Sequence, residues 1–359
     1  MKAMVKKTAV MAAILLAAAL GVGLYNYLRF IMISAPAERV TFASGTAGAQ
    51  IQLVGQLVKP ARDGIFPAVI ILHGSGRESM AEPSYRATLN TLVRSGFAVL
   101  LYDKRGVGQS GGDFATALYR DFSADASAAV RYLAERDDID SQRIGLQANS
   151  ESGWFAPEVA AGTGQVAFIF NRVGSPLSWI DTVAWEVRNE YLDGGITESD
   201  VDTLVEFAKR RWRYYIAAGH DPAAAVPAEG EAIATELQRL RREVRGAAEV
   251  LPEALPPQQN YADYAANYSY DPGPLLDALD IPMIYVFGET DVNIPTQKSA
   301  GFLAALRAAG KTNMDVVVLP GVGHSLANWK GMFTAGYVPA YLDLLSSWCR
   351  ERVAVRVRR

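Results

Sequence analysis

Ser150, Asp291 and His324 are the residues of this chain whose types and order could carry out acyl transfer. Ser150 stands between a strand-like segment, 144–148, in which Ile144 and Leu146 are apolar, and a segment from residue 152 in which large apolar residues recur at helical spacing. A serine on a sharp turn from strand to helix points its hydroxyl out of the sheet, beside the positive end of the helix. That hydroxyl remains a poor nucleophile until a base removes its proton.

The base must come from the three histidines of the 359-residue chain. His324 lies in a glycine-containing loop after the last apolar strand segment, whereas His73 follows an early strand and His220 falls in a helical segment. A histidine that acts as a base needs a carboxylate to fix its tautomer and to stabilise the imidazolium. Asp291 comes soon after the preceding strand segment, so we predict that it fills this role.

Each of these residues also has an ordinary structural interpretation. Ser150 and Asp291 could cap the helices that follow them, and His324 could be a solvated loop residue. Ser152 is a second serine that could act as the nucleophile, although it would lie two residues into the helix. The sequence alone leaves these alternatives open.

Strand-like apolar segments alternate with helical ones along most of the chain. This alternation predicts a doubly wound, mostly parallel α/β sheet. Loops at the carboxyl ends of its strands gather along one edge, where ligands bind. The predicted strands are 40–42, 51–58, 67–72, 97–102, 144–148, 166–170, 282–287 and 314–319.

The strand pattern stops for about a hundred residues after residue 174, and helical patterns replace it. We predict that this insertion is a helical lid over the carboxyl ends of the strands, with an ungated helical subdomain as the alternative. Trp212, Tyr214 and Tyr215 either line an apolar acyl pocket or form the lid's core. The predicted parts are an N-terminal segment (1–36), a core (37–174 and 272–359) and the lid (175–271).

Three lysines, the last being Lys7, precede an apolar run from about residue 8 to residue 24. This pattern is typical of a secretory signal, and Ala35-Pro36-Ala37 offers a cleavage site. The run also approaches the ~20 residues that a spanning helix needs. We favour an uncleaved membrane anchor, with a cleaved signal or a buried helix as alternatives. Because lysines stay in the cytoplasm, the catalytic part is expected on the periplasmic side, or exported.

Composition narrows the function further. Half of the residues are hydrophobic and the net charge is −3, which gives no reason to expect nucleic-acid binding. The single cysteine, Cys349, excludes an intrachain disulfide. With three histidines and one cysteine the chain lacks the usual zinc motifs, so we expect no metal and no organic cofactor.

The region from about Ala68 to Trp348 resembles the α/β-hydrolase superfamily, in particular its dienelactone-hydrolase and serine-aminopeptidase-like group. That family carries a nucleophile, an acid and a base in the order Ser, Asp, His, which here fall on Ser150, Asp291 and His324. The matching segments, in family order, are His73-Gly74-Ser75-Gly76, the run from Tyr102 to Ser110, Ala148-Asn149-Ser150-Glu151-Ser152 with Gly153 to Pro157, Gly288-Glu289-Thr290-Asp291 with Pro295, and Gly323-His324.

The resemblance also implies an oxyanion hole of two backbone N–H groups. One is expected from Glu151 and the other from Ser75, with Gly74 or Gly76 as alternatives. The chain departs from the family at Ala148 and Ser152, where glycines are usual, and at Asn149, where histidine is frequent.

The function expected from these features is a serine hydrolase that cleaves a small-molecule ester through an acyl-enzyme. Two alternatives remain. One is a serine peptidase acting on short peptides, and the other is a non-catalytic envelope binding protein that kept the fold.

Overall fold

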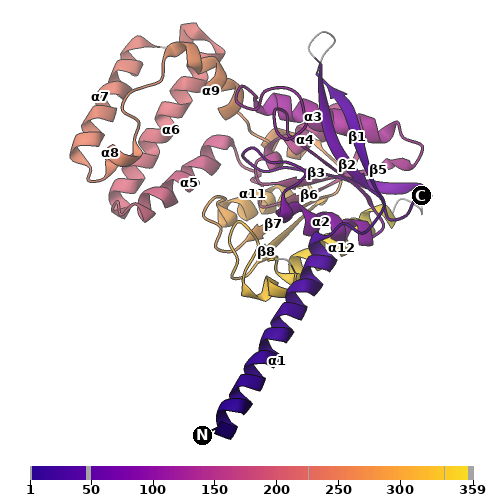
Figure 1. Ribbon diagram of the computed structural model, residues 1–359. Coiled ribbons are helices and arrows are strands. Elements are labelled where there is room, and N and C mark those ends of the chain that lie inside the picture. Colours follow the sequence, from indigo (N-terminus) through magenta and orange to yellow (C-terminus); the bar gives the residue numbers. More distant parts are fainter. Residues whose placement is uncertain (1, 46–49, 225, 335, 355–359) are drawn as a thin grey trace.

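The computed structural model describes residues 2–45, 50–224, 226–334 and 336–354, and its centre is a mixed sheet (Figure 1). The described strands run in the order β1-β2-β4-β3-β5-β6-β7-β8. Only β1 and β2 are antiparallel to their neighbours, so the sheet is mostly parallel, as predicted. The strands are β1 (Ala37–Ser44), β2 (Ile51–Val58), β3 (Phe66–Leu72), β4 (Ala98–Tyr102), β5 (Ile139–Asn149), β6 (Val166–Arg172), β7 (Met283–Gly288) and β8 (Met314–Leu319).

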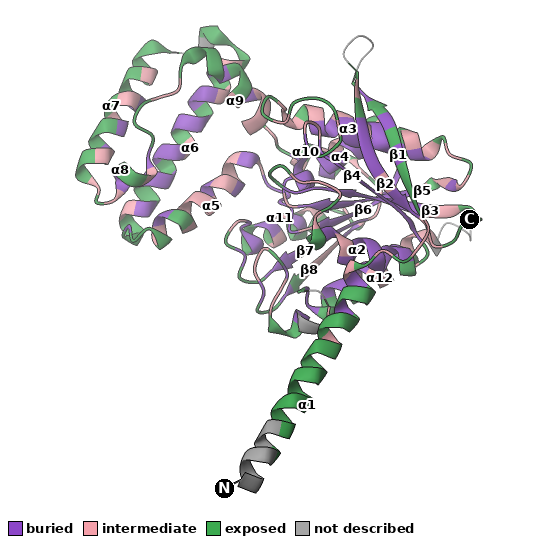
Figure 2. Cartoon of the chain, viewed as in Figure 1, coloured by how far each residue is buried: buried purple, intermediate pink, exposed green. Residues whose placement is uncertain are grey.

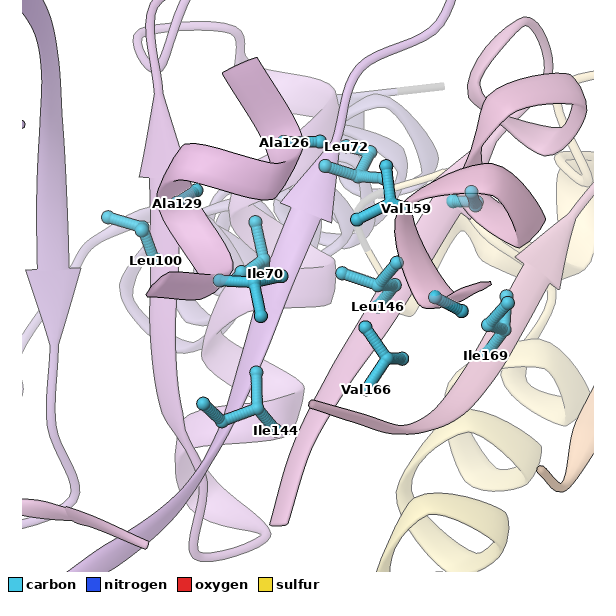
Figure 3. Close-up of a cluster of buried hydrophobic side chains, with 14 of the residues drawn as sticks. Ile70, Leu72, Leu100, Ala126, Ala129, Ile144, Leu146, Val159, Val166 and Ile169 are labelled. Carbon is cyan, nitrogen blue, oxygen red and sulfur yellow. The ribbon is translucent and has the colours of Figure 1, made fainter. Parts of the chain in front are cut away.

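Helices cover both faces of this sheet, and its central strands β3 and β4 accordingly carry apolar and aromatic residues along their length. Ile70 and Leu146 point to one face, where they pack with Ala126 and Val159 of the covering helices (Figure 3). Val69, the neighbour of Ile70, points to the other face and joins a second core. Helices of the first face include α3 (Tyr119–Ala134), α4 (Ser152–Thr163) and α11 (Thr296–Ala308), and those of the second are α2 (Pro83–Arg94) and α12 (Pro339–Ala354).

The segment between β6 and β7 is helical and has a core of its own beyond the sheet (Figure 1). Trp212 packs against Trp179, and Tyr215 stacks on Tyr261 with ring centroids 5.0 Å apart. The sequence predicts that Trp212, Tyr214 and Tyr215 either line an acyl pocket or form the core of this segment. In the structure all three are buried in that core. Its elements are α5 (Trp179–Asp193), α6 (Glu198–His220), η2 (Pro222–Ala224), α7 (Pro227–Glu243), α8 (Ala247–Val250), η3 (Gln258–Asn260), α9 (Tyr261–Tyr268) and α10 (Gly273–Ala278).

The N-terminal helix α1 (Lys2–Asn26) projects away from the globular part, and its described side chains are almost all exposed (Figure 2). Together with the π-helical turn η1 (Tyr27–Ile31) it contains an apolar stretch, 10–31, long enough to cross a membrane. Leu16 and Leu20 are each more than 60% exposed, which rules out the buried-helix interpretation.

The last helix of the structure begins at a later residue than the sequence predicts. The apolar residues Phe333, Tyr337 and Tyr341 predict a single final helix from the sequence, whereas α12 begins only at Pro339. A short 3-10 turn, η4 (Trp329–Phe333), precedes it, and Tyr337 pairs with Ala327 in an isolated bridge. The loop after β8 is therefore folded back on itself before the helix starts.

Candidate active site

Ser150 lies on a tight turn between β5 and α4 with a φ of 48°. A side chain in this left-handed region is strained, so surrounding contacts must hold it there. The Ser150 N–H donates to Arg172 O at 3.0 Å, and its carbonyl accepts from the Gly153 N–H at 2.9 Å. These bonds fix the turn and expose the Ser150 hydroxyl at the carboxyl end of the sheet.

Ser152, the alternative nucleophile, is fully buried and bonded to the backbone. Its hydroxyl accepts from the Asn149 N–H at 2.7 Å and lies 3.0 Å from Asn149 O and 3.3 Å from Leu72 O. The side chain therefore ties the start of α4 to the end of β5. The hydroxyl that lies beside a histidine is that of Ser150.

Glycines are usual in the family at positions 148 and 152, but the close backbone approach in this chain occurs at Gly153. A Cβ on Gly153 would lie 2.8 Å from the Cα of Gly174, in the loop after β6. Backbones that approach so closely exclude a side chain. Ala148, by contrast, is accommodated in the buried sheet.

His324 joins Ser150 to Asp291 through both of its ring nitrogens. Its Nε2 lies 3.0 Å from Ser150 Oγ, and its Nδ1 lies 2.9 Å from Asp291 Oδ2. Asp291 also accepts two backbone N–H bonds, from Asn293 at 2.9 Å and Ile294 at 3.0 Å. Because this carboxylate is buried and acceptor-only, it holds the proton of His324 on Nδ1 and leaves Nε2 to accept from the serine.

Two backbone N–H groups near Ser150 are available to a ligand. In the described part of the chain, neither the Ser75 nor the Glu151 N–H has a hydrogen-bond acceptor. The Gly74 N–H, an alternative donor, already bonds to Tyr85 Oη at 2.9 Å. A Cβ on Gly74 would lie 3.6 Å from Ser150 Cβ, so this loop runs directly beside the serine.

A buried ion pair that the sequence did not reveal links the two candidate donors. Lys104 Nζ lies 2.8 Å from Glu151 Oε2, with both side chains at most 10% exposed. The same ammonium donates to Gly74 O at 2.8 Å and to Gly76 O at 3.2 Å. Burial raises the pKa of Glu151, and the charge of Lys104 opposes that rise. Lys104 thus fastens the loop at 74–76 to the turn that carries Ser150.

The other histidines lie outside this arrangement. His73 is buried with its ring edge-on to Tyr85 and Tyr102. Burial, and next the charge of Lys104, lowers its pKa to about 3, so the ring is neutral. His220 ends α6 and is exposed.

The candidate residues open into a cavity of about 340 Å³ between the sheet and α5. Carboxylates and a guanidinium share this space with the Ser150 hydroxyl, so the site is polar. No group of three His, Cys, Asp or Glu side chains that could hold a metal occurs within the described ranges. Residues around the cavity include Ser75, Glu78, Ser150, Glu151, Trp154, Arg172, Thr182, Glu186, Asn293 and His324.

Comparison with known proteins agrees with this architecture. The family model for the X-Pro dipeptidyl-peptidase (S15 family) matches residues 48–325, well over half of the chain. The chain belongs to the X-Pro dipeptidyl-peptidase (S15) family. The fold of this S15 member is the α/β-hydrolase fold, as the sequence resemblance implied.

This S15 member is also similar to proteins named as esterases. It is 23% identical over 292 residues to Esterase EstD of Thermotoga maritima, a match that covers 79% of this chain and spans 60% of that relative's length. A Pyrococcus furiosus esterase structure superposes with a TM-score of 0.55 at 16% identity, covering 90% of this chain and 92% of that one. A Thermogutta terrifontis esterase gives 0.51 at 17% identity, covering 88% and 99%. These two structures share the fold.

Proposed function

We propose that this protein is a serine hydrolase that cleaves carboxylic esters. The observation that carries the proposal is the hydrogen-bonded chain from Ser150 through His324 to Asp291, with the free N–H groups of Ser75 and Glu151 beside it. A serine beside an oriented imidazole and two nearby backbone N–H donors are the parts that acyl transfer requires.

In the proposed reaction, Ser150 Oγ attacks the ester carbonyl while His324 Nε2 takes the hydroxyl proton. The carbonyl oxygen becomes an oxyanion that accepts from Ser75 and Glu151, and Asp291 stabilises the imidazolium. Collapse of the intermediate expels the alcohol, which receives the proton from Nε2. Water then attacks the acyl-enzyme by the same route, releasing the acid and restoring the Ser150 hydroxyl.

Peptide hydrolysis is the second candidate, and two observations favour it. The family is named for a dipeptidyl-peptidase activity, and the carboxylates of Glu78 and Glu186 line the same cavity. A carboxylate there would pair with the free amino group of a short peptide. An ester substrate lacks that group and needs neither carboxylate.

Fluorophosphonate labelling of the full-length protein tests both candidates against the non-catalytic alternative. We expect labelling of the wild type and of Ser152→Ala but not of Ser150→Ala. Folded but unlabelled wild type would support a binding protein. Initial rates on p-nitrophenyl esters and on Xaa-Pro-p-nitroanilides then separate esterase from peptidase, and Glu186→Gln should impair only the latter.

The helical segment 175–271 is proposed to act as a lid on the core formed by 37–174 and 272–359. The support is its α5 helix, which contacts the loop that carries Asp291. Trp185 Nε1 donates to Asp291 O at 3.3 Å, and Asn189 Nδ2 donates to Val292 O at 2.8 Å. Substrate entry is therefore expected to depend on α5.

The N-terminal segment is proposed to be an uncleaved anchor that holds the core on the periplasmic side. Its support is the contact made after the apolar stretch. Phe30 is 6% exposed within the second core, and Asn90 Nδ2 donates to Phe30 O at 2.8 Å. Cleavage after residue 37 would remove this contact. Resistance of the native protein to alkaline extraction, and an intact mass that includes α1, are the expected results.

A further inference from the structure

A groove lies where the apolar helix meets the globular part. Its volume is about 450 Å³, and its walls come from the end of α1 with η1, from α2, and from α12. Three arginines line it, one from each wall: Arg29, Arg94 and Arg350. Hydroxyl groups complete the lining, including those of Thr91, Ser95, Thr334 and Ser346.

Two of the three arginines lie near one aromatic ring, and none of the three has an acidic partner among the described residues. The guanidinium carbons of Arg29 and Arg94 lie 5.2 and 5.4 Å from the centroid of the same Phe30 ring. Arg29 contacts Tyr25 Oη, Arg94 donates to Arg29 O, and Arg350 donates to Ser346 O. Asp343 also lines the groove, but within the described part of the chain no carboxylate forms an ion pair with any of the three. The groove therefore has a net positive charge.

This excess charge raises the free energy of the protein until an anion enters. Burial, and next the charge of Arg29, lower the pKa of Arg94, as expected for two neighbouring cations. Guanidinium groups bind phosphate through paired N–H donors. The hydroxyls of Ser95 and Thr334 already donate to backbone carbonyls, so the arginines would supply the main donors to a phosphate.

The position of the groove favours a membrane lipid as the source of a bound phosphate. The apolar stretch 10–31 has 22 residues, or about 33 Å of helix, close to the ~30 Å of a bilayer's hydrocarbon core. Arg29 lies in its last turn, with Tyr25 and Tyr27 beside it, and tyrosines are enriched at this depth of a membrane. In the anchored protein the groove would lie at the level of the lipid headgroups.

We propose that this groove binds the phosphate headgroup of an anionic phospholipid in the leaflet reached by the end of α1. The site is separate from the catalytic cavity and independent of the ester chemistry proposed above. Arg29 and Arg94 hold the phosphate between η1 and α2, while Arg350 contacts it from α12. The lipid thereby joins the anchor to the core.

Native mass spectrometry of the full-length protein in detergent tests this site. Phosphatidylglycerol and phosphatidylcholine of matched acyl chains are titrated against the wild type and against Arg94→Gln/Arg350→Gln. We expect a clear preference for phosphatidylglycerol in the wild type. Losing two arginines should weaken phosphatidylglycerol binding about thirtyfold, about fivefold for each charge.

The matched control is Arg39→Gln/Arg131→Gln. Both arginines are exposed, on β1 and on α3, away from α2 and α12, and their removal changes the net charge equally. This control should bind phosphatidylglycerol as the wild type does. Equal weakening in the control would mean diffuse surface attraction and overturn the proposal, as would equal affinity for the two lipids. Inorganic phosphate that displaces phosphatidylglycerol and binds as tightly without lipid would identify a free-phosphate site instead.

Discussion

Arg172 Nε donates to Asn149 Oδ1 at 2.6 Å, joining the residue before the candidate nucleophile to the strand beside it. The same guanidinium lies 3.3 Å from Tyr337 Oη and 3.5 Å from Ser325 O, next to His324. Arg172 therefore spans the two loops whose separation sets the distance between Ser150 Oγ and His324 Nε2. Its own carbonyl also accepts from the Ser150 N–H.

We predict that Arg172 is a positioning residue. Arg172→Gln removes the side-chain contacts with Asn149, Tyr337 and Ser325, and a displacement of the two loops by about 1 Å should lower kcat roughly a hundredfold. KM for an uncharged ester should stay close to the wild-type value. Tyr337→Phe, which removes one link alone, should have a smaller effect on kcat. A raised KM with unchanged kcat would instead assign Arg172 to substrate binding.

Ser152 is predicted to contribute to stability and not to the reaction. Ser152→Ala loses the bond to the Asn149 N–H, so the free energy of unfolding should fall by about 1 kcal/mol. Urea denaturation measures this loss, and fluorophosphonate labelling should persist in the folded variant. Loss of labelling without loss of stability would contradict this role.

The buried pair of Lys104 and Glu151 gives a third prediction. Lys104→Met leaves a buried carboxylate without its partner, which should cost about 3–5 kcal/mol of stability. Adding Glu151→Gln to this variant should restore most of that loss, because the group left behind is neutral. The backbone N–H of residue 151 is the same in all these proteins. Thermal unfolding of the two single variants and the double variant measures the coupling.

His73 should make stability depend on pH. Its folded pKa of about 3 lies below the ordinary 6.5, so the unfolded chain binds the proton first as the pH falls. This stabilising contribution is complete above pH 6.5 and is lost progressively down to about pH 3. Between pH 7 and pH 5, the free energy of unfolding of the wild type should fall by ~2 kcal/mol more than that of His73→Phe. Urea unfolding of both proteins at the two pH values gives the difference, and parallel losses would rule this contribution out.

The fold and the candidate residues were accessible from the sequence because both depend on local patterns. An apolar β-branched run such as 67–72 indicates a buried parallel strand without any knowledge of which segments pack against it. The order of Ser150, Asp291 and His324 follows strand ends, and the structure brings these three together with Ser75 and Glu151. Their catalytic roles stay a prediction.

Two of the missed features depend on contacts between distant segments, and a third had a local signal that was overlooked. The Gly153–Gly174 approach involves two loops, and its only signal was a glycine next to the expected position. Lys104 was part of a recognised turn, but nothing in its neighbourhood indicated a partner 47 residues away. Helix α2 carried no recognised start signal, although Pro83 stands at its first position.

The docked turn at Phe30 affects how the anchored protein would meet its substrates. Helix α1 continues into η1, and the residues after it bond to the core through the Lys59 N–H to Pro36 O contact at 2.9 Å. Within the described residues, only the short segment 32–36 lies between η1 and β1, unlike the long random coil that tethers some proteins. The core of such a protein would not reorient freely relative to the bilayer. It would present its cavity at one height and one tilt, so the encounter rate would depend on substrates that travel along the membrane surface.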